Sequence, residues 1–496
     1  MKLTADAIRA LGAIATGGAV EQVEFDTVSD DSRNVRPGSV FVAVRGTRQD
    51  GHAFLRDACR AGAALIVVED EPSDCGTAWI RVSDSRAALS RLAALVHADP
   101  TRSLTLVGVT GTDGKTSTAI LIEAGMTACG LRAGLIGTVV YRMPGFEEPA
   151  AMTTPDPIRL QGLFARMVAS GVRGVAMEVS SHALDQRRVD GCAFAAAVFT
   201  NLTRDHLDYH KSHEAYAGAK LRLFEEVLPA SPHARGAVVN ADDPFSETIQ
   251  RRCPLPVVGF SLRGEPAPIH PVGSRYTLDG TEALLRTPWG EFPVRTRLIG
   301  AHNLANWMAA FGVAGTLGLP LDEFRRGLDA VERIPGRLER VRGRKDVQVF
   351  VDYAHTPKAI ENLLNVVRPL ARGARITIVF GAGGDRDRGK RPLMGQAAAK
   401  LADRVIVTSD NPRTEDPLAI IADIEQGVRS ALEQGAAASV VVEPDRRRAI
   451  ERAIREAGPS DVVLIAGKGH EAYQIIGTTR HEFSDVAVAR EMLDRC

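Results

Sequence analysis

Residues 104–116, LTLVGVTGTDGKT, decide the fold of the middle of the chain. The largely apolar run 104–109 is too short for a helix and predicts a buried strand. A glycine-rich turn follows at once, and the stretch from about Lys115 to Cys129 predicts a helix. A strand, a glycine-rich turn and a helix in this order predict a phosphate-binding loop.

Each part of this loop suits a nucleotide phosphate. The glycines let backbone N–H groups turn toward phosphate oxygens, and the helix N-terminus favours an anion. Lys115 would neutralise the phosphate, and the Thr116 hydroxyl can bind magnesium. Val109 stands where a strict Walker A spacing needs glycine, so the loop is a variant of that motif. A purely structural glycine turn is the competing interpretation, which the Gly-Lys-Thr ending makes the weaker one.

The segments after this loop predict a parallel sheet. Strand-like runs occur at 174–179, 195–199 and 236–240, with helical segments between them. A proline-rich stretch, 254–271, interrupts the pattern. The short strand-like pieces of 274–297 predict an antiparallel addition to this sheet.

The segments at the two ends of the chain also predict α/β structure. Near the start, 39–44 and 64–68 are predicted to be buried strands. A rigid and a flexible residue at 334–336, Ile-Pro-Gly, predict a hinge. Beyond it, helical patterns separate five strand-like runs, typical of a doubly wound domain. These runs are 348–351, 376–380, 404–408, 439–442 and 462–466.

The predicted fold is therefore α/β with three domains. Residues 1–102 would form a small α/β domain. Residues 103–334 would form a central P-loop ATPase-like domain with a parallel sheet. Residues 335–496 would form a Rossmann-like doubly wound domain.

Composition excludes several classes of function. Lysine plus arginine equal aspartate plus glutamate at 61 each, so no global field favours nucleic acid or an anionic membrane. With 25% charged residues, no apolar run is long enough to span a bilayer, and the N-terminus lacks the pattern of a secretory signal. We expect a cytoplasmic protein without membrane insertion. The six cysteines are scattered, without a CxxC pair or zinc-ligand spacing.

Polar groups follow two further strands of the central region. Glu178 ends one strand-like run, and the segment 200–210, TNLTRDHLDYH, follows the next. A glutamate and a histidine at neighbouring strand ends suit a divalent ion beside bound phosphate. Either segment alone would indicate only an ordinary polar loop.

Six motifs occur in the order found in the Mur ligase family, which the chain resembles over nearly its whole length. They are TGTDGKT at 110–116, MEVSSH at 177–182, TNLTRDHLDYH at 200–210, GAHNLANW at 300–307, IPGRLE at 334–339 and VDYAHTP at 351–357. Residues 31–33, 410–413 and 467–471, reading DSR, DNPR and GKGHE, resemble the diaminopimelate-adding branch. Asp113 stands where the family more often has asparagine.

The resemblance implies an ATP-dependent ligase. ATP would phosphorylate a carboxylate of UDP-MurNAc-L-Ala-D-Glu, and the amine of meso-diaminopimelate would attack the acyl phosphate. Positioning and charge neutralisation do most of such work. The implied catalytic residues are Lys115, His206 and Lys220. The implied magnesium ligands are Thr116, Glu178, His206 and Lys220, the last as a carbamate.

The implied binding residues fall into three groups. ATP would contact the phosphate loop, two asparagines at its adenine end, and Arg337 and Asp352 across a closing cleft, at phosphate and ribose. The full ATP set is Gly111, Thr112, Asp113, Gly114, Lys115, Thr116, Ser117, Asn303, Asn306, Arg337 and Asp352. The UDP-substrate set is Ser32, Thr153, Thr154, Ser180, Gln186 and Arg188. The diaminopimelate set is Arg386, Asp410, Asn411, Pro412, Arg413, Gly467 and Glu471.

The choice of amino acid depends mainly on the arginines. Diaminopimelate differs from lysine by a distal carboxylate, which Arg413 could bind in a bidentate fashion, with Arg386 beside it. Glu471 suits the distal ammonium. Lysine or ornithine as acceptor stays open at this point. A folylpolyglutamate synthetase and, in a different class of function, an ATP-controlled binding protein stay open as well. We expect a monomer that binds no nucleic acid.

Overall fold

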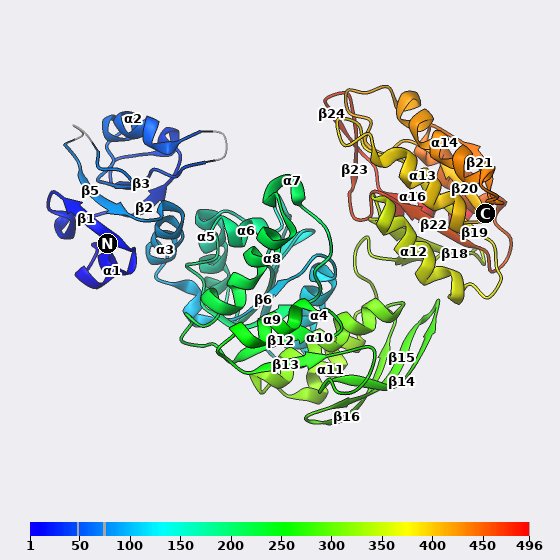
Figure 1. The fold of residues 1–496 in the computed structure, drawn as a ribbon, viewed down its shortest axis with the longest axis horizontal. Coiled ribbons are helices and arrows are strands. Elements are labelled where there is room, and N and C mark those ends of the chain that lie inside the picture. The colour runs from blue at the N-terminus through cyan, green and yellow to red at the C-terminus, as the bar shows by residue number, and fades with distance from the viewer. Residues whose placement is uncertain (47–48, 73–75, 496) are drawn as a thin grey trace. The chain divides into compact units, whose positions relative to one another are not determined.

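The structure is a computed structural model that describes residues 1–46, 49–72 and 76–495. Their contacts form two compact units, each considered by itself below. The first comprises Met1–Val272, Leu285–Phe292 and Ala305–Ala330. The second comprises Gly273–Leu284, Pro293–Leu304 and Val331–Cys496. The chain builds three α/β domains (Figure 1), as its sequence predicts. The exact bounds at 102 and 334 stay predictions.

The N-terminal domain is built on a sheet with the order β1-β5-β4-β3-β2. Its strands are β1 (Ala13–Gly17), β2 (Thr27–Ser29), β3 (Ser39–Val42), β4 (Leu65–Val68) and β5 (Ala78–Val82). Strand β1 is antiparallel to β5, and the other pairs are parallel. Both predicted strands, β3 and β4, are confirmed and fully buried. Helix α3 (Ser85–Val96) begins at Asp84, whose side chain accepts a hydrogen bond from the Ala87 N–H.

The central domain carries a sheet with the order β13-β12-β11-β6-β10-β7-β8-β9. Strand β6 (Thr105–Thr110) lies between β10 (Gly174–Glu178) and β11 (Phe194–Phe199), parallel to both. Glu178 pairs with Val109, and Phe199 pairs with Thr110. The carboxyl ends of the three strands therefore lie side by side, which brings the loops after 110, 178 and 199 together.

The remaining central strands include the one predicted at 236–240 and four that were not predicted. The strands are β7 (Ala133–Ile136), β8 (Val140–Met143), β9 (Phe146–Pro149), β12 (Gly236–Asn240) and β13 (Val257–Phe260). The helices are α4 (Lys115–Ala128), α5 (Pro157–Ala169), α6 (Ser181–Asp185), α7 (Leu207–His210), α8 (His213–Arg222), α9 (Phe245–Arg252), α10 (Ala301–Leu317) and α11 (Leu321–Asp329). The helix expected from Lys115 is confirmed to within one residue of its end.

The prediction that 274–297 adds strands to the central sheet is wrong. Strands β14 (His270–Thr277), β15 (Gly280–Thr287) and β16 (Gly290–Thr296) form a separate sheet. Turns of two residues join these strands, so each satisfies its backbone groups with its neighbour and needs no pairing with the central sheet. The antiparallel addition lies instead at the far edge, where β8 pairs with β7 and β9.

The C-terminal domain has the sheet order β17-β18-β22-β19-β20-β21. All five predicted strands are confirmed as β18 (Gln348–Asp352), β19 (Ile376–Phe380), β20 (Arg404–Val407), β21 (Ser439–Val442) and β22 (Val462–Ala466). They pair in parallel, and β17 (Glu339–Val341) is antiparallel at the edge. A hairpin, β23 (Tyr473–Ile476) and β24 (Thr479–Glu482), was not predicted. The helices are α12 (Pro357–Leu370), α13 (Lys390–Leu401), α14 (Pro417–Glu433), α15 (Arg446–Glu456) and α16 (Asp485–Arg495).

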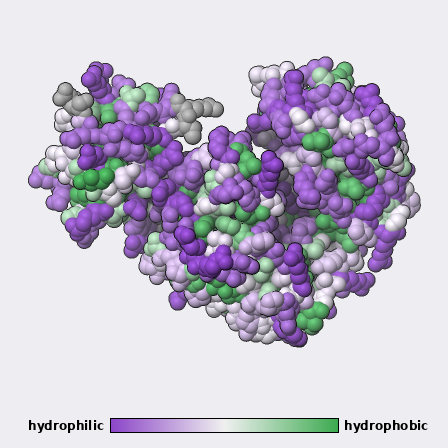
Figure 2. All heavy atoms as spheres, viewed as in Figure 1, coloured by the Kyte–Doolittle hydropathy of each residue, from purple (hydrophilic) through white to green (hydrophobic). Residues whose placement is uncertain are grey.

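Polar side chains cover most of the face seen in Figure 2. Among the described residues, no helix combines the length and the apolar character needed to cross a bilayer. Among the described cysteines, Cys129, Cys192 and Cys253 are free thiols.

Candidate functional site

The turn between β6 and α4 can be built only with glycine at two positions. Gly111 and Gly114 have φ angles of 151° and 83°, in a region that other residues rarely adopt. A side chain at Gly111 would also collide with the Thr200 hydroxyl, and one at Gly114 would meet the Asn306 side-chain oxygen. The predicted glycine-rich turn is therefore confirmed, and its close neighbours come from distant parts of the sequence.

The loop after β11 holds the backbone of this turn. The N–H groups of Thr112 and Asp113 donate to the main-chain and side-chain oxygens of Asn201, at 2.9 and 2.8 Å. The Thr200 hydroxyl donates to the Asp113 carbonyl at 2.6 Å. The Asp113 side chain is exposed, so its main chain shapes the loop while its carboxylate stays in solvent. This explains how the loop accommodates aspartate in place of the more usual asparagine.

Lys115 lies over the turn. Its ammonium donates to the carbonyls of Gly111 and Thr112, at 2.9 and 2.7 Å. A nucleotide phosphate bound by the turn would therefore lie close to the Lys115 ammonium. The next residues, Thr116 and Ser117, are buried in the first turn of α4.

Lys220, on α8, reaches the same carbonyl. Its side chain is 1% exposed, and its Nζ donates to the Gly111 carbonyl at 2.7 Å. Burial, aided by the charge of Lys115, lowers the pKa of Lys220 well below its usual value. An amine reacts with carbon dioxide only when unprotonated, so this environment suits the carbamate that the resemblance implies.

Glu178 is the buried carboxylate of the site. Its Oε1 accepts hydrogen bonds from the Thr116 hydroxyl at 2.9 Å and from the Thr138 N–H at 2.7 Å. Its Oε2 accepts from the Thr138 hydroxyl at 3.0 Å. Thr116 and Glu178, both predicted magnesium ligands, therefore lie in direct contact, and their binding of magnesium stays a prediction. Thr138 was missed, because a lone Gly-Thr after β7 carries no motif.

These oxygen donors fit a magnesium ion. Magnesium prefers hard oxygen ligands and keeps several waters or phosphate oxygens. Thr116 and Glu178 offer such oxygens beside the phosphate loop. In the described part of the chain, no three His, Cys, Asp or Glu side chains are grouped as a metal site. Magnesium here would consequently need phosphate, water and carbamate oxygens as well.

His206 stands among other aromatic rings. It has a φ of 53°, its Nε2 lies 3.5 Å from Asp205 Oδ2, and its ring centroid lies 4.9 Å from that of His182. Burial lowers the pKa of His182 and of His210, which favours neutral imidazoles. The predicted place of His206 among the magnesium ligands stays a prediction.

Four residues of the predicted UDP-substrate set form one hydrogen-bonded group. The Thr154 hydroxyl donates to the Glu178 carbonyl at 2.8 Å and accepts from the Ser180 N–H at 3.0 Å. Arg188 donates to the Thr154 carbonyl at 2.8 Å and to Gln186 Oε1 at 2.7 Å. Hence the binding segment is tied directly to the strand end that carries Glu178.

Two further predicted residues complete this set. The Thr153 hydroxyl lies 3.1 Å from that of Thr138, whose own hydroxyl contacts Glu178. Ser32 is half-buried in a short helical turn, η2 (Ser32–Asn34), of the N-terminal domain. The side chain of Asp31 starts this turn by accepting the Arg33 N–H.

The predicted nucleotide contacts outside the loop lie in two places. Asn306 accepts from the Thr118 hydroxyl at 3.3 Å, beside the phosphate loop. Asn303 donates to the Ile299 carbonyl at 2.9 Å. In the C-terminal domain, Arg337 lies 5.3 Å from the Tyr353 ring, and Asp352 accepts the Leu338 N–H at 2.7 Å. Burial raises the pKa of Asp352, against the opposing charge of Arg337.

The two arginines of the predicted amino-acid site lie on joined loops. Arg413 has a φ of 50° and donates to the Gly384 carbonyl at 2.8 Å. The Gly384 N–H donates to the Asn411 carbonyl at 2.9 Å. Arg386, two residues after Gly384, is exposed. The loops after β19 and β20, which carry these two arginines, are therefore hydrogen-bonded to each other.

A fully buried lysine, Lys468, contacts three further residues of the predicted amino-acid site. Its Nζ donates to Asn411 Oδ1 at 3.0 Å and lies 3.4 Å from carboxylate oxygens of Asp410 and Glu471. Asn411 in turn donates to Glu471 Oε2 at 3.0 Å. The sequence signal for Lys468 was its place inside GKGHE, a motif interpreted only through its glycine and glutamate.

Two other predicted residues of this site are part of its backbone. Gly467 has a φ of 114°, and a side chain there would collide with Asp410 Oδ2. Pro412 is buried, and its carbonyl packs directly against Gly384. Both residues thus shape the loops, and their predicted contact with the amino acid stays a prediction.

Another missed group lies below the two arginine-bearing loops. The Arg391 side chain is 1% exposed and donates to both carboxylate oxygens of Glu415, at 2.8 and 3.1 Å, and to the Gly383 carbonyl. The Asp385 N–H donates to the same carboxylate at 2.5 Å. Arg391 lowers the pKa of Glu415 to about 2, so this pair stays ionised at any physiological pH.

Three models of Mur ligase domains match this chain. The model described as Mur ligase family, catalytic domain, matches residues 24–97. The Mur ligase middle domain matches 109–314, and the Mur ligase glutamate ligase domain matches 336–469.

Individual relatives match over nearly the whole chain. A protein of Geobacter metallireducens named UDP-N-acetylmuramoyl-L-alanyl-D-glutamate--2,6-diaminopimelate ligase is 46% identical over 97% of this chain and 96% of its own. The protein of that name from Geobacter sulfurreducens is 44% identical, with the same shares covered. A solved structure titled with the same enzyme name has a TM-score of 0.75 at 34% identity and covers 99% of both chains.

Proposed function

Since this chain belongs to the Mur ligase family, we propose that it is an ATP-dependent ligase that joins meso-diaminopimelate to UDP-MurNAc-L-Ala-D-Glu in peptidoglycan precursor synthesis. The observation that carries this proposal is the meeting of Lys115, Lys220 and Glu178 around the phosphate loop. Relatives named for this reaction match nearly the full length, which favours it over a folylpolyglutamate synthetase.

The proposed chemistry has two steps. A carboxylate oxygen of the UDP-substrate attacks the γ-phosphorus of ATP, and ADP leaves. The amine of the amino acid then attacks the acyl phosphate, and the tetrahedral intermediate expels inorganic phosphate to leave the amide. No protein nucleophile is needed, so positioning and charge neutralisation supply the catalysis.

The residues of the chain divide this work. Lys115 neutralises the transferring phosphate, and the N–H groups of the phosphate loop orient it. Thr154, Gln186 and Arg188 hold the UDP-substrate beside the end of β10. Magnesium, when bound by Thr116 and Glu178, would supply further positive charge at the phosphates. A cytoplasmic location belongs to this proposal, because ATP is a co-substrate.

The C-terminal loops would select the amino acid. Arg413 and Arg386 would bind the distal carboxylate of diaminopimelate, and Glu471 its distal ammonium. Lysine and ornithine lack that carboxylate. Among the described residues, they would leave the Arg413 guanidinium with the Gly384 carbonyl as its hydrogen-bond partner but with no carboxylate.

Phosphate release by the purified protein tests the proposal. We expect release only when ATP, UDP-MurNAc-L-Ala-D-Glu and meso-diaminopimelate are all present, with the tripeptide product confirmed by mass. Lysine or ornithine should support less than about 1% of that rate, the equivalent of about 2.7 kcal/mol. ATP turnover that ignores both other substrates would contradict ligation.

Replacing Arg413 by alanine should relax the acceptor preference. We expect kcat/KM for diaminopimelate to fall about 100-fold, as the loss of a bidentate charged contact implies, and kcat/KM for lysine to change little. The KM for ATP should stay the same. Steady-state kinetics with each acceptor measure this.

Arg429→Ala serves as the matched control for that substitution. Arg429 is an exposed arginine on α14 of the same domain and belongs to none of the predicted sites. It should leave the acceptor preference unchanged. An unaltered ratio between diaminopimelate and lysine in Arg413→Ala would remove Arg413 from the specificity site.

A further inference from the structure

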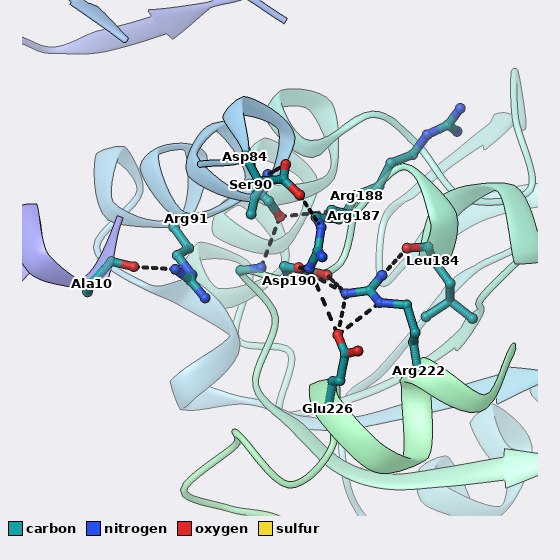
Figure 3. A network of polar contacts seen from close by, with 12 residues as sticks. Ala10, Asp84, Ser90, Arg91, Leu184, Arg187, Arg188, Asp190, Arg222 and Glu226 are labelled. Carbon is teal, nitrogen blue, oxygen red and sulfur yellow. Dashed lines mark hydrogen bonds and ion pairs between the residues drawn. The ribbon is translucent and has the colours of Figure 1, made fainter. Parts of the chain in front are cut away.

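A polar junction joins helix α3 of the N-terminal domain to the loop 187–191 of the central domain (Figure 3). Its centre is Ser90, whose side chain is fully buried. The Ser90 hydroxyl donates to the Arg188 carbonyl at 3.1 Å and accepts from the Gly191 N–H at 2.9 Å. One side chain of the first domain thus satisfies two backbone groups of the second.

The approach of the two elements is close at this point. A side chain at Gly191 would collide with the Ser90 carbonyl, so the loop lies directly on the helix backbone. Gln161, on α5 of the central domain, donates a hydrogen bond to the Gly191 carbonyl at 3.2 Å. Backbone groups buried in such a contact need hydrogen-bond partners. Without the Ser90 hydroxyl, the Arg188 carbonyl would lose the hydrogen bond that it accepts from Ser90.

Charged groups hold the same loop on both sides (Figure 3). Arg187, at a φ of 55°, forms an ion pair with Asp84, the residue that starts α3. Arg187 also donates to Asp190 at 3.0 Å, and Arg222 of α8 lies 3.2 Å from the same carboxylate. The left-handed backbone at 187 is therefore fixed by partners from α3 and α8 together.

The loop also carries a predicted substrate contact, Arg188. The Arg188 guanidinium reaches the Thr154 carbonyl and Gln186, inside the UDP-substrate group. The Ser90 hydroxyl donates a hydrogen bond to the backbone carbonyl of the same residue. Any shift of that backbone would be passed to the guanidinium, because the side chain starts from it.

We propose that Ser90 is a positioning residue through which the N-terminal domain sets the place of Arg188 in the UDP-substrate site. This inference rests on the proposed function for the identity of the ligand. It assigns Ser90 no contact with the substrate. The N-terminal domain, which carries Ser32 of the predicted UDP-substrate set, would thereby also order Arg188 of the same set.

The test is a double-mutant cycle in the full-length protein with Ser90→Ala, Arg188→Ala and the double variant. We expect Ser90→Ala to raise the KM for UDP-MurNAc-L-Ala-D-Glu about 10-fold, with kcat within twofold and the KM values for ATP and diaminopimelate unchanged. In the Arg188→Ala background, Ser90→Ala should add nothing. Equal increases in both backgrounds would overturn the proposal, as would an unchanged KM in Ser90→Ala.

Thr101→Val is the matched control. The Thr101 hydroxyl is buried and accepts the Ala193 N–H at 3.0 Å, just beyond the same loop, without touching Arg188. Valine keeps the shape and removes the hydroxyl. It should leave the KM for the UDP-substrate within twofold. A 10-fold increase of this KM in Thr101→Val would mean that the loss of any buried hydrogen bond near the loop weakens substrate binding. That result would contradict a specific role of Ser90.

Asp84→Asn provides a second variant should Ser90→Ala fold poorly. Asparagine keeps the hydrogen bond that starts α3 but removes the charge that pairs with Arg187. We expect a two- to threefold increase in the same KM, absent in the Arg188→Ala background. In that case, no increase in the KM of Asp84→Asn would overturn the proposal.

Calorimetric binding of UDP-MurNAc-L-Ala-D-Glu without ATP separates this inference from the proposed function. Weaker binding by Ser90→Ala than by the unaltered protein supports the positioning role whether or not ligation is observed. Equal binding overturns it. Absence of ligation by the unaltered protein, with binding intact, would overturn the proposed function alone.

Discussion

Lys115→Ala is expected to lower kcat/KM for ligation by about 1,000-fold, the equivalent of about 4 kcal/mol of lost transition-state stabilisation. The Lys115 ammonium lies over the phosphate loop and is held there by two loop carbonyls. Charge that develops on the transferring phosphoryl group would lose its nearest cation. Steady-state phosphate release measures the effect, and the melting temperature should change little, because the side chain is only partly buried.

Lys400→Ala is the control for that experiment. Lys400 is an exposed lysine near the end of α13, and none of the predicted sites includes it. We expect its activity to match the unaltered protein. If Lys115→Ala retained more than about a tenth of the unaltered rate, the phosphate loop would not be the place of phosphoryl transfer.

Lys220→Ala is expected to lower kcat about 100-fold, and a short carboxylate such as acetate should restore part of it. The physical reason is the near-complete burial of the amine, which with the charge of Lys115 lowers its pKa. Because a lowered pKa enlarges the neutral fraction of the amine at any pH below its usual value, carbamylation becomes accessible near neutral pH. The added carboxylate would then replace the carbamate oxygens.

Lys220→Arg sharpens this test. Arginine keeps a positive charge and fills the space, so it can neither carry a carbamate nor admit acetate. We expect it to be inactive and not rescued. Activity retained by Lys220→Arg, with no rescue of Lys220→Ala, would mean that Lys220 acts as a cation on the Gly111 carbonyl and that the carbamate is absent.

Local patterns determined much of the candidate site. The glycines of the phosphate loop need unusual φ angles, and Ser180 starts α6 by accepting the Ala183 N–H, so both are readable from short segments. The strand periodicity of the C-terminal domain was equally local, and all five predicted strands are present there. Such signals survive in sequence because they depend on neighbours along the chain.

Long-range packing decided the rest. No local signal marks Thr138 as a partner of Glu178, or Arg391 as the cation below the arginine-bearing loops, since their partners lie 40 and 24 residues away. The strands of 274–297 were predicted correctly as strands, but their sheet was misplaced, because pairing partners are chosen by tertiary contacts.

By itself, the sequence determined a three-domain α/β protein with a phosphate loop, together with the residue types that ligation needs. Only the tertiary structure decided how far each of those residues is buried and which charges and hydrogen-bond partners surround it. Lys220 looks like an ordinary lysine on a helix, and its lowered pKa exists only because folding removes water from it and brings Lys115 near. Ser90 likewise acquires its partners, 98 and 101 residues away, only when two domains pack together. Backbone preference is local, whereas burial and charge depend on the whole fold.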